Sequence, residues 1–375
     1  MKRLLQQLLA VGVVAAAMPT TDGLGQRPSA KPVPGGGLRK SPGAPRVRIG
    51  SAAAGPAGLV QVTAGTVLRD RYVVIANSGT RELLFFDFGG RLIRRVGRDG
   101  DGPGEFRNLA WVGHWEGDSL IAYDAITRRF SVLSGEGVFG RSFRAHGTPR
   151  AVIPLGVADT ARLFVALEDG VDPHVTAGVV RDSATVVVVG STGNIIRTVG
   201  RVASSEWLAW GSRAVRLELG RSSFFAVVDG QVLYVDSHSG ELAPLGWVGA
   251  PARARAVPAA RRPLSQTEIG SVLSGYDADP EVQQHLADYY AGRGIAAPVL
   301  QGLVVDSSGR LWVGLTPANG APFKTWQIVG ANGSLVDSVE LPATARILAV
   351  TRLLLLTHLV DSEGVESIEF IGLRK

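Results

Sequence analysis

The sequence predicts an all-β fold, a six-bladed β-propeller with a short helical insertion between blades 4 and 5. Three observations support this prediction. A motif recurs at a spacing near 47 residues, short runs of β-branched and aromatic residues alternate with turn residues, and one segment with helical periodicity interrupts them. A period of this length, made of strand pairs and tight turns, is typical of the four-stranded blades of a propeller.

The repeat is clearest in two segments, 90–98 and 193–201, which lie 103 residues apart and share Gly, Ile, Arg, Val, Gly and Arg at the same positions. Each is followed by an acidic and an aromatic residue, and weaker copies start at Gly137, Gly240 and Gly333. Tandem helical repeats also occur at this period. However, runs such as 71–76 and 230–236 are short, rich in β-branched residues and bounded by turn residues, which favours strands.

We predict blades at about 59–100, 108–147, 150–200, 207–249, 299–341 and 344–375. The last of these has room for about three strands. A strand near 46–50 would complete it and close the ring. Closure of this kind leaves few exposed strand edges that could aggregate.

The N-terminal 45 residues differ from the rest. Met1-Lys2-Arg3 precedes an apolar run with small residues near Ala17, which predicts a secretory signal peptide at 1–17. That run is shorter than the roughly 20 apolar residues that cross a bilayer, and we expect no transmembrane segment. Residues 18–45 are rich in Pro and Gly and lack aromatic residues, which predicts a flexible linker before a propeller domain at 46–375.

The net charge of +6 is located mainly in that linker. Residues 18–50 carry six Arg or Lys and one Asp, and the chain from Ser51 onward has a net charge of −1. A folded domain so near neutrality has no electrostatic footprint for phosphate backbones, so we expect no nucleic-acid partner. The chain has no cysteine, which excludes disulfides, thiolate metal sites and a cysteine nucleophile.

Two further segments resemble NHL-repeat and related six-bladed propellers. Residues 97–106, GRDGDGPGEF, resemble the loop that joins blades in that superfamily. Residues 303–313, LVVDSSGRLWV, resemble its innermost strand, turn and second strand, whereas 207–249 departs from the pattern. The superfamily contains binding scaffolds and several types of enzyme. The resemblance therefore implies a fold and not a reaction.

The segment at about 263–294 is predicted to contain two short helices. Ser265 and Glu268 form a capping box before apolar residues at helical spacing. Asp279 and Pro280 then supply an N-cap and a first-turn proline. Two placements stay open for these helices: a lid over a binding site, or packing against the sides of the blades.

The topology of a blade predicts where a functional surface lies. The link from one blade to the next emerges on the same face as the second-to-third turn, and loops on a rigid scaffold often carry function. The links 98–105 and 201–206 and the helical insertion should therefore lie around one mouth of the central channel. The candidate binding residues on this face are Arg98, Asp101, Glu105, Arg201, Glu206 and Tyr289.

A structural role is the alternative for the repeated motif, and repetition favours it. Its glycines would form turns, its Arg and Glu would pair between blades, and Phe106 would enter the core. We predict no catalytic residue, metal or cofactor, because the six histidines form no local ligand pair and no nucleophile elbow or phosphate loop is present. Asp99 and Asp101 begin like a calcium loop, but Ala110 stands where that loop needs Glu.

Three functions stay open, and we favour the first. It is a secreted or periplasmic, monomeric scaffold that binds a peptide, glycan or protein. The alternative is a metal-dependent hydrolase or lactonase resembling gluconolactonase-type propellers, with candidate ligands Asn77, Asp124, Glu168 and Asp306. The third is a structural module of an envelope assembly. Convergent acidic or amide side chains in the channel would favour the enzyme, whereas an apolar or sealed channel with an exposed aromatic rim would favour the scaffold.

Overall fold

The computed structural model describes residues 39–40, 45–50, 58–68, 71–146, 152–159, 162–168, 174, 176–245, 255–257, 261–291, 294–318, 320–330 and 334–373. The predicted signal peptide, 1–17, and most of the predicted linker, 18–45, lie outside the described residues.

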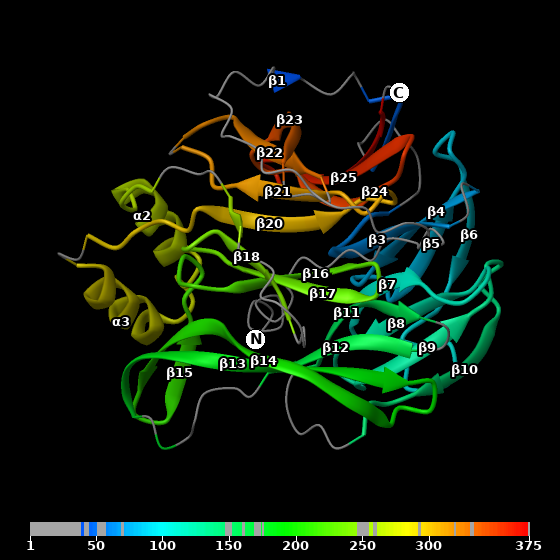
Figure 1. Cartoon of the computed structure of the whole chain (residues 1–375), viewed down its shortest axis with the longest axis horizontal. Coiled ribbons are helices and arrows are strands. Elements are labelled where there is room, and N and C mark those ends of the chain that lie inside the picture. Colours follow the sequence, from blue (N-terminus) through cyan, green and yellow to red (C-terminus); the bar gives the residue numbers. More distant parts are fainter. Residues whose placement is uncertain are drawn as a thin grey trace, which may run out of the picture.

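The described residues form a six-bladed β-propeller, which confirms the predicted fold class (Figure 1). Blade 1 contains β3 (Val62–Leu68), β4 (Tyr72–Asn77), β5 (Glu82–Phe86) and β6 (Leu92–Val96). Blade 2 contains β7 (Leu109–His114), β8 (Leu120–Asp124), β9 (Arg129–Leu133) and β10 (Phe139–Phe143). Blade 3 contains β11 (Val152–Asp159), β12 (Arg162–Glu168), β13 (Ala177–Gly190), β14 (Ile195–Trp210) and β15 (Arg213–Arg216).

The remaining three blades follow in chain order around the ring. Blade 4 contains β16 (Ser223–Val228), β17 (Gln231–Asp236), β18 (Glu241–Pro244) and β19 (Arg255–Ala256). Blade 5 contains β20 (Leu300–Val305), β21 (Leu311–Leu315), β22 (Phe323–Val329) and β23 (Leu335–Pro342). Blade 6 contains β24 (Arg346–Val350), β25 (Leu354–Val360), β26 (Glu366–Gly372) and the N-terminal strand β2 (Val47–Ile49).

The second strands are apolar on both faces because each blade packs between two neighbours. Strand β4, YVVIAN, is buried at every position. Its side chains enter two apolar layers, one shared with blade 6 and one with blade 2. A strand buried on both faces is a continuous apolar run, which is why these segments were recognisable in the sequence.

The ring is closed as predicted, by a strand from the N-terminal side. Strand β2 pairs antiparallel with β26, and Arg48 Nε donates to Glu369 Oε1 at 2.8 Å. A second contact joins blade 6 to blade 1, because Glu366 Oε2 accepts from the Val62 backbone N–H at 2.8 Å. The N-terminal strand β2 and the last strand, β26, thus complete one sheet together.

The predicted boundary between blades 3 and 4 is wrong. Strand β14 continues without a break to Trp210, and blade 4 begins at Ser223 rather than near 207. Strand β13 pairs with β14 over this whole length, from Ala177↔Trp210 to Val189↔Ile195, and β15 pairs with its end. The predicted link at 201–206 is therefore strand. We call residues 177–182 and 206–216, which extend blade 3 beyond its neighbours, the arm.

The predicted helices are present between blades 4 and 5 as α2 (Gln266–Ser274) and α3 (Pro280–Tyr290). The capping box of Ser265 and Glu268 and the Asp279 N-cap both form as expected. The helices lie beside β15 (Figure 1). Their apolar side chains pack on the arm, in a separate core that contains Leu208, Val215, Leu217, Val272, Val282, Leu286 and Tyr290. This partner is an extension of blade 3, which neither of the two predicted placements described.

One strand lies inside the predicted linker. Residues Arg39–Lys40 form β1, which pairs in parallel with β23 at the outer edge of blade 5 (Figure 1). The prediction of a flexible segment is wrong for these two residues. Among the described residues, no helix is long and apolar enough to cross a membrane.

Candidate functional site

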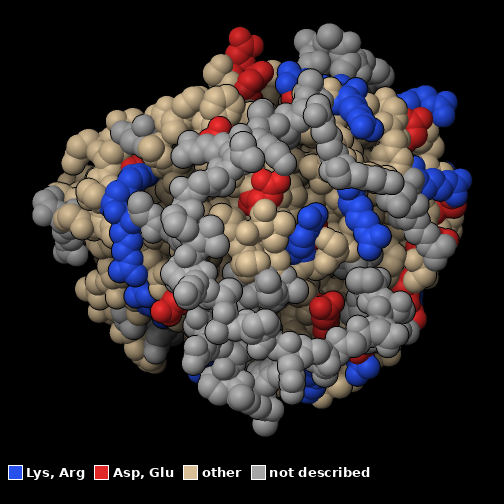
Figure 2. All heavy atoms as spheres, turned by 45° about the horizontal axis from the view of Figure 1, so that its top comes forward, with Lys and Arg blue, Asp and Glu red and all other residues tan. Residues whose placement is uncertain are grey.

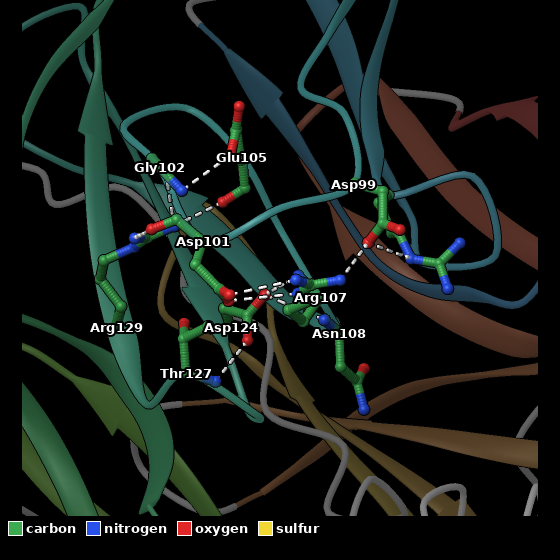
Figure 3. Close-up of polar contacts among 10 residues, drawn as sticks. Asp99, Asp101, Gly102, Glu105, Arg107, Asn108, Asp124, Thr127 and Arg129 are labelled. Carbon is green, nitrogen blue, oxygen red and sulfur yellow. Dashed lines mark hydrogen bonds and ion pairs between the residues drawn. The ribbon is translucent and has the colours of Figure 1, made fainter.

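The links between blades and the second-to-third turns emerge on one face, which we call the loop face. The link between blades 1 and 2, residues 97–108, contains three of the predicted binding residues and a chain of ion pairs (Figure 3). Arg107 donates to both carboxylate oxygens of Asp101, at 3.1 Å each. It also reaches Asp99 at 3.3 Å, and Asp99 contacts Arg81 at 3.1 Å. Charges of both signs are therefore arranged along this link.

Glu105 determines how the link folds back on itself. Its carboxylate accepts from the Gly102 backbone N–H at 2.8 Å and from Arg98 Nε at 2.7 Å. The next residue, Phe106, is completely buried between blades 1 and 2, as expected. The predicted Arg–Glu pair exists, but it closes one link rather than joining two blades. These contacts give Arg98 and Glu105 a structural role within the link.

Blade 2 supports the link through two buried side chains. Arg129, at the start of β9, donates to three carbonyl oxygens of the link, those of Asp101, Gly102 and Glu105. Asp124, at the end of β8, is completely buried and accepts from four backbone N–H groups, those of Arg107, Asn108, Ile126 and Thr127. The link is therefore fixed from below by side chains that a partner would not reach (Figure 3).

Contacts within the link favour the charged form of two of its carboxylates, those of Asp101 and Glu105. The Arg107 side chain beside Asp101 lowers the pKa of that carboxyl. The Gly102 N–H and Arg98 lower the pKa of Glu105. Hydrogen bonds to the charged form of an acid favour ionisation, so neither group is suited to give or take a proton near neutral pH. The electrostatics of the link fit binding better than acid–base chemistry.

Sequence reasoning missed the two arginines that organise this cluster. Arg107 and Arg129 lie in different elements, and each acts on a loop residue through a contact that no local pattern encodes. The only available signal was the position of Arg107, directly after the repeated Glu-Phe pair. Near them, Ile126 is 54 % exposed, which adds an apolar contact point at the β8–β9 turn.

The other three predicted residues belong to β14 and to α3. Arg201 lies in β14 and donates to the Ser183 hydroxyl at 2.6 Å. Glu206 also lies in β14, where its carboxylate accepts from the Arg221 backbone N–H at 2.8 Å. Tyr289, on α3, contacts Tyr290 edge to face with ring centres 5.0 Å apart. The structure thus brings Arg98, Asp101 and Glu105 together and places the remaining three in separate elements.

A second charged cluster holds the helices against the arm. Arg213 of β15 forms ion pairs with Asp279, at 2.7 Å, and with Glu281 at the start of α3. The Trp210 indole N–H donates to Glu281 at 2.8 Å, and the Trp210 ring stacks on His285 with ring centres 4.4 Å apart. The arm and the two helices therefore form one unit, which lies beside the links of the loop face.

The four candidate metal ligands do not converge. Asn77 accepts from the Val60 N–H at 2.8 Å, Glu168 accepts from Ser204 at 2.7 Å, and Asp306 accepts from Arg310 at 2.7 Å. Together with Asp124, each is engaged with its own turn or strand. The described residues contain no group of three His, Cys, Asp or Glu side chains that would hold a metal ion. This donor set does not fit the divalent metal that gluconolactonase-type propellers imply.

The strands next to the channel are mainly apolar. Among the described innermost strands, β3, β7, β11, β16, β20 and β24, the one acidic residue is Asp159. It lies at the end of β11, away from the loop face, and pairs with Arg162 at 2.5 Å. Convergent acidic side chains are the feature that would favour an enzyme, and these strands do not supply them.

The fold defines the chain as a six-bladed β-propeller, and the comparisons agree at that level. Neither a protein-family model nor a curated protein matches the sequence. A Bacteroides fragilis protein named "putative exported protein" has a similar fold, with a TM-score of 0.50 and 13% identity over 86% of this chain and 93% of that one.

Two other solved structures are more distant. A member of the DUF4221 family from Bacteroides vulgatus has a TM-score of 0.46 at 9% identity over 84% of this chain and 92% of its own. An inactive virginiamycin B lyase from Staphylococcus aureus has a TM-score of 0.42 at 9% identity over 85% of this chain and 83% of its own. Similarity at this level of identity establishes the fold alone.

Proposed function

We propose that this protein is an exported binding scaffold that takes a peptide, glycan or protein partner on its loop face. The observation that carries the proposal is the blade 1–2 link. Its backbone is fixed from below by Arg129 and Asp124, while Arg98, Asp101 and Arg107 are 80%, 67% and 42% exposed. A rigid surface with exposed charges of both signs binds with little loss of conformational freedom, which favours affinity.

Mixed charge also limits the kind of partner. On the face in Figure 2, described Asp and Glu side chains lie among the described Lys and Arg side chains, apart from one run of basic side chains at the left. Extended phosphate backbones are bound by continuous basic surfaces, so a nucleic acid is a poor match. A partner with its own discrete acidic, basic and polar groups, such as a protein, a peptide or a charged glycan, suits the link better.

The finer assignments belong to the same proposal. The segments at 97–106 and 303–313 support membership of the NHL-repeat-like superfamily. The leader at 1–17 supports export, to the periplasm or the medium, with the mature chain acting as a monomer. Arg201, Glu206 and Tyr289 would contribute through the arm and the helices, which stand beside the links.

The proposal is tested by screening the mature chain on peptide and glycan arrays. Arg98→Ala with Arg107→Ala should abolish the strongest signals. Arg91→Ala is the matched control, because Arg91 is also 80% exposed and also ion-paired, to Asp87, but lies in a turn on the opposite face. Signals that survive the double substitution, or that Arg91→Ala removes equally, would contradict binding through the link.

A further inference from the structure

Lys324 differs from every other basic residue of the described propeller in its surroundings. From residue 46 onward the chain contains only two lysines, Lys324 and Lys375, and otherwise uses arginine. Lys324 is the second residue of β22, at the end of blade 5 that faces the loop side. It makes no hydrogen bond and no ion pair with the part of the chain that the structure describes. Its ammonium nitrogen lies 6.0 Å from the centre of the Trp326 ring.

The surroundings of Lys324 are apolar. Alternate residues of a strand share a face, so Lys324 projects on the same side as Trp326 and Ile328. That side belongs to the apolar layer between blades 5 and 6, which contains Leu341 and Ile347. Burial lowers the pKa of Lys324, and no charged group of the described residues offsets it.

Charged residues of the neighbouring strands do not face the Lys324 amine. Glu340 of β23 pairs with Thr325, the neighbour of Lys324, and so lies on the other face of blade 5. In blade 6, Arg346 donates to the carbonyl oxygens of Val62 and Thr63 in blade 1. Among the described residues, Glu340 and Arg346 therefore do not neutralise the positive charge of the Lys324 amine.

Two more polar atoms close to Lys324 lack a partner among the described residues. The indole N–H of Trp326 is buried, with the residue 3% exposed, and finds no acceptor. The hydroxyl of Thr316 is also buried without a partner. The pairing between β21 and β22 ends at Gly314↔Trp326, and Thr316 lies two residues beyond it, at the same end of blade 5 as Lys324. Buried polar groups without hydrogen bonds are costly, and such a group in a native fold calls for an explanation.

We propose that Lys324 binds a carboxylate group of the partner, with the Trp326 ring as an apolar wall. This inference rests on the proposed function, because it identifies what the loop face recognises. A carboxylate accepts hydrogen bonds only, which matches the unpartnered donors here. It also supplies the negative charge that the partly buried ammonium of Lys324 lacks.

Lysine suits this role better than arginine does. An arginine remains charged in proteins, whereas a lysine amine loses its proton when it is buried and regains it beside an acid. Binding of a carboxylate therefore favours the protonated form of Nζ. Binding should weaken as the pH rises above the pKa of the free amine, because proton uptake then becomes unfavourable.

The experiment measures how fast Lys324 is acetylated by an N-hydroxysuccinimide ester, as a function of pH, by mass spectrometry of the mature chain. Lys375 in the same protein is the internal reference. The probes are benzoate and a short peptide that ends in a Phe carboxylate, with the same peptide as its C-terminal amide for control. Lys324→Met and Lys375→Met serve as the site variant and the matched control for direct binding by calorimetry.

We expect Lys324 to react at lower pH than Lys375, and benzoate or the acid peptide to slow its acetylation at least tenfold, while the amide has no effect. Protection by benzoate alone would identify a free small carboxylate, and protection by the peptide alone would identify a chain terminus. An ordinary pH profile for Lys324, or equal protection by acid and amide, would overturn the inference. Array binding that depends on Arg98 but survives Lys324→Met would overturn it and leave the proposed function intact.

Discussion

The two copies of the repeated motif, at 90–106 and 193–207, begin alike and end in different structures. The first becomes the blade 1–2 link, because Gly97 and Gly100 adopt positive φ angles of 108° and 153° and turn the chain. The second runs on as strand β14, because Val202, Ala203 and two serines stand where the first copy has Asp, Gly and Pro. Because these four residues of the second copy do not favour a turn, β14 continues and pairs with β13.

The comparison of the two copies shows that the backbone conformation determines which contacts a repeated side chain makes. Glu105 accepts from Gly102 and Arg98 within its own link, whereas Glu206 projects from a strand and accepts from the Arg221 N–H of the following loop. The glutamate of the first copy thus stabilises an exposed link, whereas the glutamate of the second copy stabilises the start of the arm. A repeated motif identifies equivalent positions along the chain, but it does not identify equivalent functional groups.

The largest expected effect is the loss of the support beneath the link. Arg129→Ala removes the donors to three link carbonyls from a residue that is 7% exposed. Buried hydrogen bonds from charged groups are worth about 1.5–3 kcal/mol each, and partners left unpaired add to the loss, so we expect about 3 kcal/mol of destabilisation. Urea unfolding measures it. Arg98→Ala is the control and should cost less than about 1 kcal/mol, because its ion pair is exposed. Equal costs would contradict the account of the link.

The equivalent glycines of the two copies provide a direct test of the comparison. At Gly97 an alanine Cβ would lie 2.8 Å from the Arg81 carbonyl oxygen, at a φ of 108°. At Gly200 the nearest atom, also at 2.8 Å, is the movable end of the Leu245 side chain, and φ is not in the positive range. We expect Gly97→Ala to cost about 2–3 kcal/mol and Gly200→Ala less than about 1 kcal/mol. Thermal unfolding of both variants measures the difference, and a reversed order would break the comparison.

Acid should loosen the helical insertion. Arg262 and the Ser265 N–H lower the pKa of Glu268 from 4.5 to about 2. A carboxyl whose pKa is depressed by folding stabilises the fold fully above its unfolded value, and this contribution falls away as the pH drops toward the folded value. The protection of the α2 amides, measured as their exchange rate relative to an unfolded peptide at the same pH, should therefore fall between about pH 4.5 and about 2. Glu268→Gln should already exchange fast at pH 7, and an α2 that exchanges at the same rate in both proteins at pH 7 would contradict the prediction.

The smallest expected effect concerns metal. The described candidate ligands are engaged separately, so a chelator should change the melting temperature of the mature protein by less than about 1 °C. Metal analysis of the purified chain, followed by melting with and without chelator, measures this. A stoichiometric divalent ion whose removal lowers the melting temperature would sharpen the alternative of a metal-dependent hydrolase and direct attention to the channel.

The sequence was sufficient for the features that depend on local pattern. Six blades, closure by β2, the capping box of α2 and the Asp279 N-cap of α3 follow from periodicity, length and cap residues. The arm was missed because Val202 and Ala203 are compatible with either strand or loop, and only the pairing with β13 decides. The packing surface of the helices was missed for the same reason, since Leu208 and Val215 lie on that arm.

The charged cluster of the blade 1–2 link, the proposed binding surface, was partly predictable. Arg98, Asp101 and Glu105 were identified because they lie in a link whose face the blade topology determines. Arg107 and Arg129 were not, because their roles arise from contacts between elements. The unpartnered amine of Lys324 also has no sequence signature beyond the rarity of lysine in this chain.

The central claim, that the blade 1–2 link is the binding surface, is tested most directly by hydrogen–deuterium exchange with and without the best ligand from the arrays. The account predicts that the ligand slows exchange in 97–108 and at the β8–β9 turn, and leaves the turn at 87–91 on the opposite face unchanged. Protection confined to that opposite turn, or to the innermost strands of the channel, would contradict it.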